Sequence, residues 1–130
     1  MSATTSGPSL GFAVDVERLD DDGIVTSTVI DPDLGLLAGH YPGFPIFPGV
    51  CLLECAHQSV LAAAHHWSRE VDIDAVETTR FLGPVLPGDR VTTDVRFQLS
   101  PSAWRCSGVL RTDQGKVAEV RLAYRVRGAP

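Results

Sequence analysis

The stretch GHYPGFPIFPGVCLLECAHQ, residues 39–58, changes character halfway along. Its first half carries three prolines and three glycines, whereas its second half is apolar with Glu54 and Gln58 embedded in it. Proline fixes φ and glycine permits backbone geometries closed to other residues, so the first half is expected to be a stiff loop. The second half opens a run without proline or glycine that ends at a tryptophan, which predicts a helix over residues 49–67.

The predicted helix is apolar almost all round, which is typical of a helix buried on most sides. The other segments alternate between apolar and polar residues, with glycine, proline and aspartate turns between them. Strands are expected over residues 12–19, 23–30, 71–83, 89–99, 104–112 and 116–127. One buried helix among antiparallel strands predicts an α+β fold in which a sheet wraps the helix. Residues 1–10 are expected to be a disordered tail, and residues 11–130 a single domain.

The composition narrows the function classes. The chain has 130 residues, 44% hydrophobic and 21% charged, with a formal charge of −5. Without a basic stripe, nucleic acid is not expected as a partner. No stretch reaches the roughly 20 apolar residues that span a bilayer, and the first residues lack a secretory signal, so no membrane association is expected. An odd number of cysteines (Cys51, Cys55 and Cys106) indicates reduced thiols and a cytoplasmic location.

His40 lies in the loop that is rich in proline and glycine. A histidine in a loop is usually a solvated surface residue. Here the restricted backbone around it can hold one side chain in position, as acid–base catalysis requires. His40 is therefore a candidate acid–base residue.

Glu54 falls in the second turn of the predicted helix. A buried carboxyl group either pairs or raises its pKa and stays protonated, and a protonated acid in an apolar cleft serves as a general acid. The helix N-terminus opposes this by favouring the charged form, and a structural acid satisfied by the backbone is an equal alternative. Gln58 lies one turn later and is a candidate to orient the carboxyl group, whereas His57 is expected to be a satisfied core or interface histidine.

The cysteines offer a second possible chemistry. Cys51 is near the helix N-terminus, which lowers the pKa of a thiol, but a small buried residue is the favoured interpretation. Cys51 and Cys55 are one turn apart, yet a zinc site needs about four ligands, and no second pair has suitable spacing. No metal and no cofactor are expected.

The stretch that opens at residue 39 closely resembles the active-site segment of the hotdog-fold 3-hydroxyacyl-[acyl-carrier-protein] dehydratases of the FabZ type. That family's pattern is approximately G-H-F-P-G-x-P-x-M-P-G-V-x-x-x-E-x-x-x-Q. The residues in register are His40, Pro42, Gly43, Pro45, Pro48, Gly49, Val50, Glu54 and Gln58. RFLGPVLPGDRV, residues 80–91, is similar to a second pattern of the family, R-F-x-x-P-V-x-P-G-D. A glutamate at position 54 favours this type over the related dehydratase/isomerase, which has aspartate there.

The resemblance implies a hotdog fold of five to six strands around the helix, in a homodimer or an oligomer of dimers with continuous sheets. Each active site would combine His40 of one subunit with Glu54 of the other. The implied reaction is dehydration of a 3-hydroxyacyl thioester on acyl carrier protein or CoA, in fatty-acid or polyketide-type biosynthesis. His40 would abstract the C2 proton and Glu54 would protonate the departing hydroxyl. Gly49 and Val50 would bind the substrate at the helix start, and Gln58 would support Glu54.

Two departures from the family pattern concern the substrate. Tyr41 and Phe47 replace the usual phenylalanine and methionine, and these aromatic residues are expected to bind the substrate and narrow or redirect its acyl channel. Other hotdog activities stay open: a thioesterase that hydrolyses an acyl thioester, and an enzyme that adds another nucleophile to an enoyl thioester. A non-catalytic dimerisation partner is a further alternative. The presence of both His40 and Glu54 in register favours dehydration.

Overall fold

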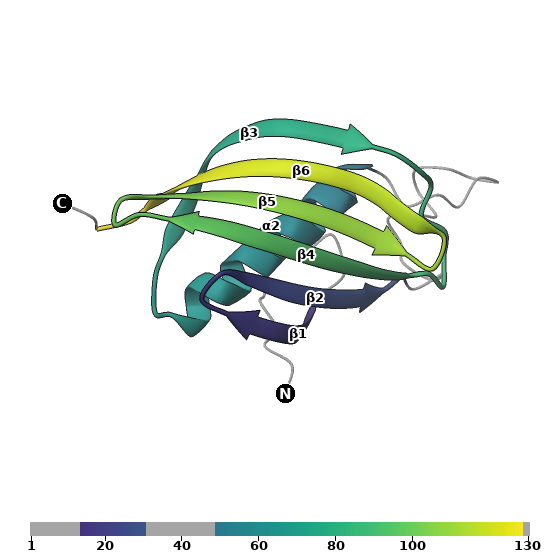
Figure 1. Ribbon diagram of the computed structural model, residues 1–130, viewed down its shortest axis with the longest axis horizontal. Coiled ribbons are helices and arrows are strands. Elements are labelled where there is room, and N and C mark those ends of the chain that lie inside the picture. The colour runs from purple at the N-terminus through teal and green to yellow at the C-terminus, as the bar shows by residue number, and fades with distance from the viewer. Residues whose placement is uncertain (1–13, 31–48, 129–130) are drawn as a thin grey trace.

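The structure, a computed structural model, describes residues 14–30 and 49–128. In these residues one helix accompanies one antiparallel sheet of six strands, ordered β1-β2-β4-β5-β6-β3 (Figure 1). The elements are β1 (Asp15–Asp20), β2 (Gly23–Val29), α2 (Gly49–His66), β3 (Val71–Phe81), β4 (Arg90–Leu99), β5 (Ala103–Thr112) and β6 (Gly115–Val126). The predicted α+β class is confirmed, and the observed element ends lie within a few residues of the predicted ones. No helix in the described part of the chain is long and apolar enough to cross a membrane.

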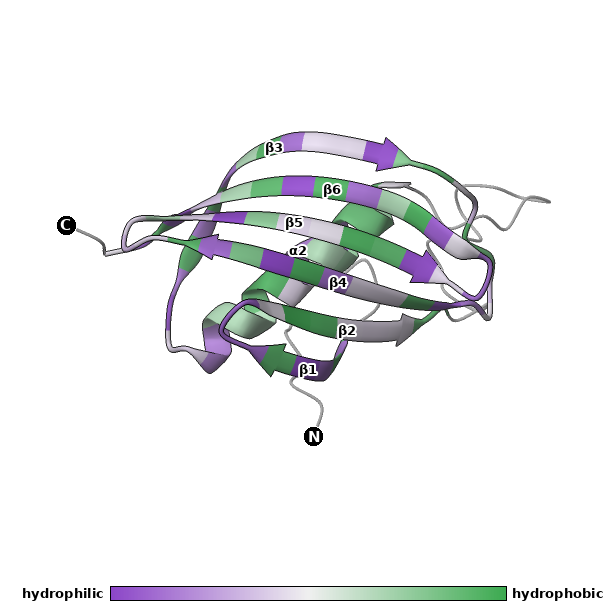
Figure 2. Cartoon of the chain, in the orientation of Figure 1, coloured by the Kyte–Doolittle hydropathy of each residue, from purple (hydrophilic) through white to green (hydrophobic). Residues whose placement is uncertain are grey.

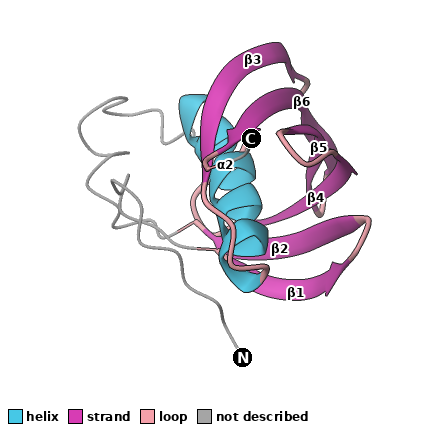
Figure 3. Cartoon of the chain, turned by 90° about the vertical axis from the view of Figure 1, so that its left-hand side faces the viewer, coloured by secondary structure: helices cyan, strands magenta, loops and turns pink. Residues whose placement is uncertain are grey.

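The sheet curves around α2, which lies against its concave face (Figure 3). Small side chains let the helix approach the strands closely. Gly108 on β5 is an example, because a Cβ atom there would stand 3.0 Å from the Val120 side chain and 3.8 Å from the Cβ of Ala56 on the helix. The helix and the strands therefore share one core with little space between them.

Alternation along the strands separates the core from the outer face of the sheet. On β5, Trp104, Cys106 and Leu110 are buried, whereas Arg105 and Ser107 between them are exposed. Because successive side chains of a strand point to opposite faces, the first set points toward the helix. Hydropathy alternates in the same way along the strands, and α2 is mostly apolar (Figure 2).

β3, at one edge of the sheet, departs from this pattern. Only Val71 of this strand is buried, and Ile73, Val76 and Phe81 are 47%, 49% and 51% exposed. Directly paired residues of antiparallel strands share a face of the sheet. Their partners on β6 are buried: Tyr124, Leu122 and Ala118. The three apolar side chains of β3 thus lie on the helix side of the sheet and are about half exposed there.

Aromatic residues close the core at the C-terminal end of α2. Trp67, Phe97 and Trp104 meet edge to face, with ring centroids 5.6–5.9 Å apart. Such pairs add about 0.5–1.5 kcal/mol beyond the area that they bury. The end of the helix is therefore fixed on β4 and β5.

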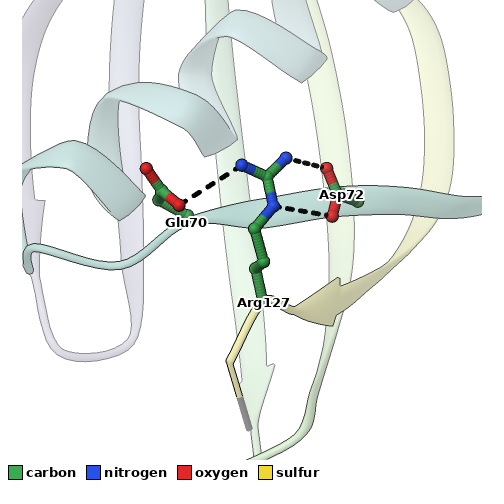
Figure 4. A network of polar contacts seen from close by, with 3 residues as sticks. All are labelled: Glu70, Asp72 and Arg127. Atoms are coloured by element: carbon green, nitrogen blue, oxygen red, sulfur yellow. Dashed lines mark hydrogen bonds and ion pairs between the residues drawn. The ribbon is translucent and has the colours of Figure 1, made fainter.

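Polar contacts join the start of β3 to the end of β6. Arg127 donates from Nε to Asp72 at 3.1 Å and from Nη1 to Glu70 at 3.2 Å (Figure 4). All three side chains are substantially exposed, so water screens these ion pairs and they contribute little to stability. The contacts align the strand ends more than they stabilise the fold.

Candidate active site

One face of α2 is less buried than the rest of the helix. Val50 is 62% exposed, and the other residues of this face are half-buried: Leu53, Glu54, His57 and Leu61. Their spacing of three or four residues places them along one side of the helix. We call this stripe the open face of α2; it sets one carboxyl group and one imidazole among apolar neighbours.

Glu54 is held by the residue one helical turn later. Gln58 is fully buried, and its Nε2 donates a hydrogen bond of 3.3 Å to Oε2 of Glu54. Residues four apart on a helix are neighbours, so the helix itself creates this contact. The orienting role expected for Gln58 thus has a geometric basis. Glu54 itself is only half-buried on the open face rather than enclosed in the core.

Gly49 begins the helix and is covered by an aromatic ring. A Cβ atom at this position would lie 2.9–3.1 Å from three ring atoms of Phe81, which is closer than side chains approach one another. Glycine therefore lets Phe81, at the end of β3, stand directly against the helix start. The first N–H groups of a helix lack intrahelical partners and carry partial positive charge. The sequence interpretation missed Phe81, although the RFLGPVLPGDRV motif contains it.

His57 is joined to the sheet by Tyr124 of β6. The His57 Nδ1 and the Tyr124 hydroxyl are 2.7 Å apart, and the two rings are parallel with centroids 5.7 Å apart. Burial lowers the pKa of His57, and the nearby charge of Glu54 opposes that shift. Burial also raises the pKa of Tyr124, which is 1% exposed. Nothing in the sequence distinguished Tyr124 from other inward positions of its strand.

The three cysteines are free and buried in the core. Burial, helped by the charge of Glu54, raises the pKa of the Cys51 thiol to about 11. Burial raises the pKa of Cys106 to about 12 and also raises the pKa of Cys55. Only a thiolate is a competent nucleophile, so these thiols are inert near neutral pH. This agrees with the interpretation of Cys51 as a small buried residue.

The structure brings four expected site residues together. Gly49, Val50, Glu54 and Gln58 occupy the first three turns of α2. The other three expected residues, His40, Tyr41 and Phe47, lie outside the described residues. Their roles stay predictions.

Comparisons with known proteins agree with the resemblance noted in the sequence. The chain is 35% identical over 89 residues to a 3-hydroxyacyl-[acyl-carrier-protein] dehydratase FabZ of Myxococcus xanthus, covering 62% of this chain and 58% of that protein. It is 45% identical over 65 residues to a FabZ of Actinobacillus pleuropneumoniae, covering 45% of this chain and 42% of that protein. The chain thus spans about half the length of these relatives.

Solved structures of low identity share the fold. The dehydratase heterocomplex ApeI:P of Xenorhabdus doucetiae superposes with a TM-score of 0.69 at 18% identity, covering 85% of this chain and 93% of that chain. A hypothetical thioesterase with coenzyme A from Streptococcus pneumoniae has a TM-score of 0.74 at 13% identity, covering 89% of this chain and 87% of that chain. These neighbours confirm the predicted hotdog architecture. The family model for ApeI dehydratase matches residues 16–119, which is most of the sequence, and the chain belongs to the ApeI-like dehydratase family.

Proposed function

We propose that this protein is a 3-hydroxyacyl-thioester dehydratase. It removes water from an acyl chain carried on acyl carrier protein or CoA and leaves the trans-2-enoyl thioester, in fatty-acid or polyketide-type biosynthesis. The family membership and the FabZ relatives support this reaction. The strongest structural support for dehydration is the carboxyl group of Glu54, which Gln58 orients and which lies among apolar residues close to a helix start.

The proposed reaction needs one base and one acid. His40, 14 positions before Glu54, takes the proton from C2 of the substrate. The electron pair of that C–H bond forms the C2–C3 double bond, and the C3–O bond breaks. Glu54 gives its proton to the departing hydroxyl, which leaves as water. Exchange with solvent then returns a proton to Glu54 and removes one from His40, so that the enzyme is unchanged.

Substrate binding is proposed at the start of α2. As the C2 proton leaves, negative charge develops on the thioester oxygen. Backbone N–H groups at Gly49 and Val50, on the positive end of the helix dipole, are suited to stabilise that charge. Phe81 shields this position from water on the β3 side. Tyr41 and Phe47 are proposed to narrow the acyl channel.

A homodimer, or an oligomer of dimers, is the proposed assembly. The half-exposed apolar side chains of β3 (Ile73, Val76 and Phe81) lie on the helix side of the sheet, and β3 is an edge strand of the sheet in the described residues. Pairing of β3 with its copy would cover these side chains and make the two sheets continuous. It would also bring His40 of one subunit to Glu54 of the other. The reduced, buried thiols support a cytoplasmic location.

The test is an incubation of the purified protein with 3-hydroxybutyryl and crotonyl thioesters. Ultraviolet absorbance follows the enoyl thioester, and a thiol reagent follows hydrolysis. We expect interconversion of the two thioesters without release of free thiol, and its loss in a His40→Ala variant. Release of thiol as the only product would show a thioesterase instead. Full turnover by His40→Ala would exclude His40 as the base.

A further inference from the structure

The direction of the hydrogen bond between His57 and Tyr124 follows from burial. The Tyr124 hydroxyl is buried and carries one proton, and in the described residues His57 Nδ1 is the acceptor that it reaches. If Nδ1 carried the imidazole proton, the hydroxyl would have to accept, and its own proton would be buried without a partner. That arrangement is unfavourable, because a buried polar hydrogen without a partner has lost its hydrogen bond to water. Tyr124 therefore donates to Nδ1, and the proton of neutral His57 rests on Nε2.

His57 and Glu54 are neighbours on the open face of α2. They are three residues apart on one helix, and the charge of Glu54 acts on His57. Burial favours the neutral imidazole, which has a donor on only one of its two nitrogens. Because Nδ1 accepts the hydrogen bond from Tyr124, the donor of His57 is Nε2, on the side of the ring away from the sheet. The parallel packing of the two rings restricts rotation of the imidazole.

We propose that His57, with its tautomer fixed by Tyr124, is a positioning residue that supplies an Nε2–H donor to the carboxylate formed on Glu54. The inference rests on the proposed function, because it concerns the acid that protonates the departing hydroxyl. When Glu54 gives up that proton, negative charge appears on its carboxyl group. Gln58 already donates to Oε2, which leaves the other carboxyl oxygen for the donor of His57. Because both donors belong to the helix that carries Glu54, little reorganisation is needed as charge develops in the transition state.

The titratable groups around Glu54 and His57 stay protonated near neutral pH. They are Cys51 and Cys55 on α2, Tyr124 on β6 and Cys106 on β5. Burial raises the pKa of all four, so none of them titrates near neutral pH. A rate measured near neutral pH therefore does not report the titration of these four groups. In the proposed reaction His40 must be neutral and Glu54 protonated.

The first test measures the tautomer directly, without substrate. The ring nitrogens of neutral histidine differ in ¹⁵N chemical shift according to which one carries the proton. The chain has four histidines, and a His57→Leu variant assigns the signals of His57. We expect the proton on Nε2 in the wild-type protein and a mixture of tautomers in Tyr124→Phe. A wild-type His57 protonated on Nδ1 would overturn the proposal.

The second test is kinetic. We expect His57→Leu to lower kcat of dehydration about tenfold or more, with KM within about twofold, because a donor to a charged acceptor is lost. His57→Gln retains a donor and should recover much of kcat. The kcat of Tyr124→Phe should lie between those of His57→Leu and His57→Gln.

The two tests separate this inference from the proposed function. A wild-type protein that dehydrates, beside a His57→Leu variant with unchanged kcat, would overturn the role of His57 alone. A wild-type protein that does not dehydrate any of the thioesters overturns the proposed function, and with it the role of His57 at Glu54. The tautomer measurement still decides the geometry of His57 and Tyr124 in that case. Thermal unfolding of each variant shows whether a lower rate reflects misfolding.

Discussion

The two faces of α2 carry different kinds of residue. The sheet-facing side presents small or apolar side chains such as Cys51, Cys55 and Ala56, all buried. The open face carries Glu54 and His57 among apolar residues, and both are half-buried. One helix thus serves both the core and the candidate active site, and the buried Gln58 connects the two through its hydrogen bond to Glu54. Substitutions on the two faces should therefore separate into effects on stability and effects on activity.

The two faces of α2 also differ in which titratable groups are available for chemistry. The thiols on the sheet-facing side have their pKa raised by burial and stay protonated. The carboxyl group of Glu54 has a side-chain amide as its partner and is only half-buried. Candidate chemistry therefore belongs to the open face, and the thiols belong to the core.

The largest effect is expected for Glu54→Gln, which removes the proton donor and keeps the shape of the side chain. Dehydration should fall by about 10²–10⁴-fold, the usual contribution of a general acid. The fold should persist, because Glu54 is not part of the core. The initial rate of enoyl thioester formation measures the effect, with Glu70→Gln as a matched control on an exposed glutamate. Equal rates in wild type and Glu54→Gln would remove the acid from the mechanism.

The next effect is on stability and belongs to the sheet-facing side. Leu52 is 3% exposed, so Leu52→Ala should lower the free energy of unfolding by about 2–5 kcal/mol through lost burial and a cavity. Leu53 is half-buried, and Leu53→Ala should cost clearly less. Urea denaturation of both variants makes the comparison. A larger loss for Leu53→Ala would mean that the open face is covered as tightly as the core.

A smaller effect is expected at the helix start. Gly49→Ala introduces a Cβ atom 2.9 Å from the Phe81 ring, so the half-exposed ring must swing away. We expect kcat/KM to fall about tenfold, a loss of about 1.4 kcal/mol, with little change in stability because alanine favours the helix. Adding Phe81→Leu should restore part of the rate. No recovery in the double variant would show that the contact with Phe81 is not the cause.

The smallest effect concerns the thiols. Since the pKa of Cys51 is about 11, its thiol is protonated at pH 8 and should react slowly with iodoacetamide. The rate should rise as the pH approaches 11, and denaturation should expose all three cysteines at once. Mass spectrometry of the alkylated protein counts the modified residues. Rapid labelling of Cys51 in the folded protein at pH 8 would contradict its place in the core.

Much of the fold could be predicted from the sequence because its patterns are local. An apolar run without proline or glycine predicted α2, and alternation with turn residues predicted the strands of the sheet. The order of the strands was not predictable from these patterns, because β3 follows the helix in sequence yet pairs with the last strand, β6. That pairing depends on packing between distant segments.

The candidate site was predictable only where its parts lie on one helix. Glu54 and Gln58 are one turn apart, so helical geometry alone predicts their contact. Phe81 and Tyr124 reach the helix from β3 and β6, and no spacing rule connects them to it. Burial of Glu54 was overestimated, because the apolar surroundings in sequence do not reveal which face of the helix the sheet covers.

Incorporation of deuterium from D₂O tests directly whether the open face of α2 performs acid–base chemistry at C2 and C3. Crotonyl thioester is incubated with the wild-type protein, and the products are analysed by mass spectrometry and NMR. We expect an intact 3-hydroxybutyryl thioester with one deuterium at C2, and almost none of this product with Glu54→Gln. Free thiol and unlabelled crotonate, without any hydrated thioester, would contradict it.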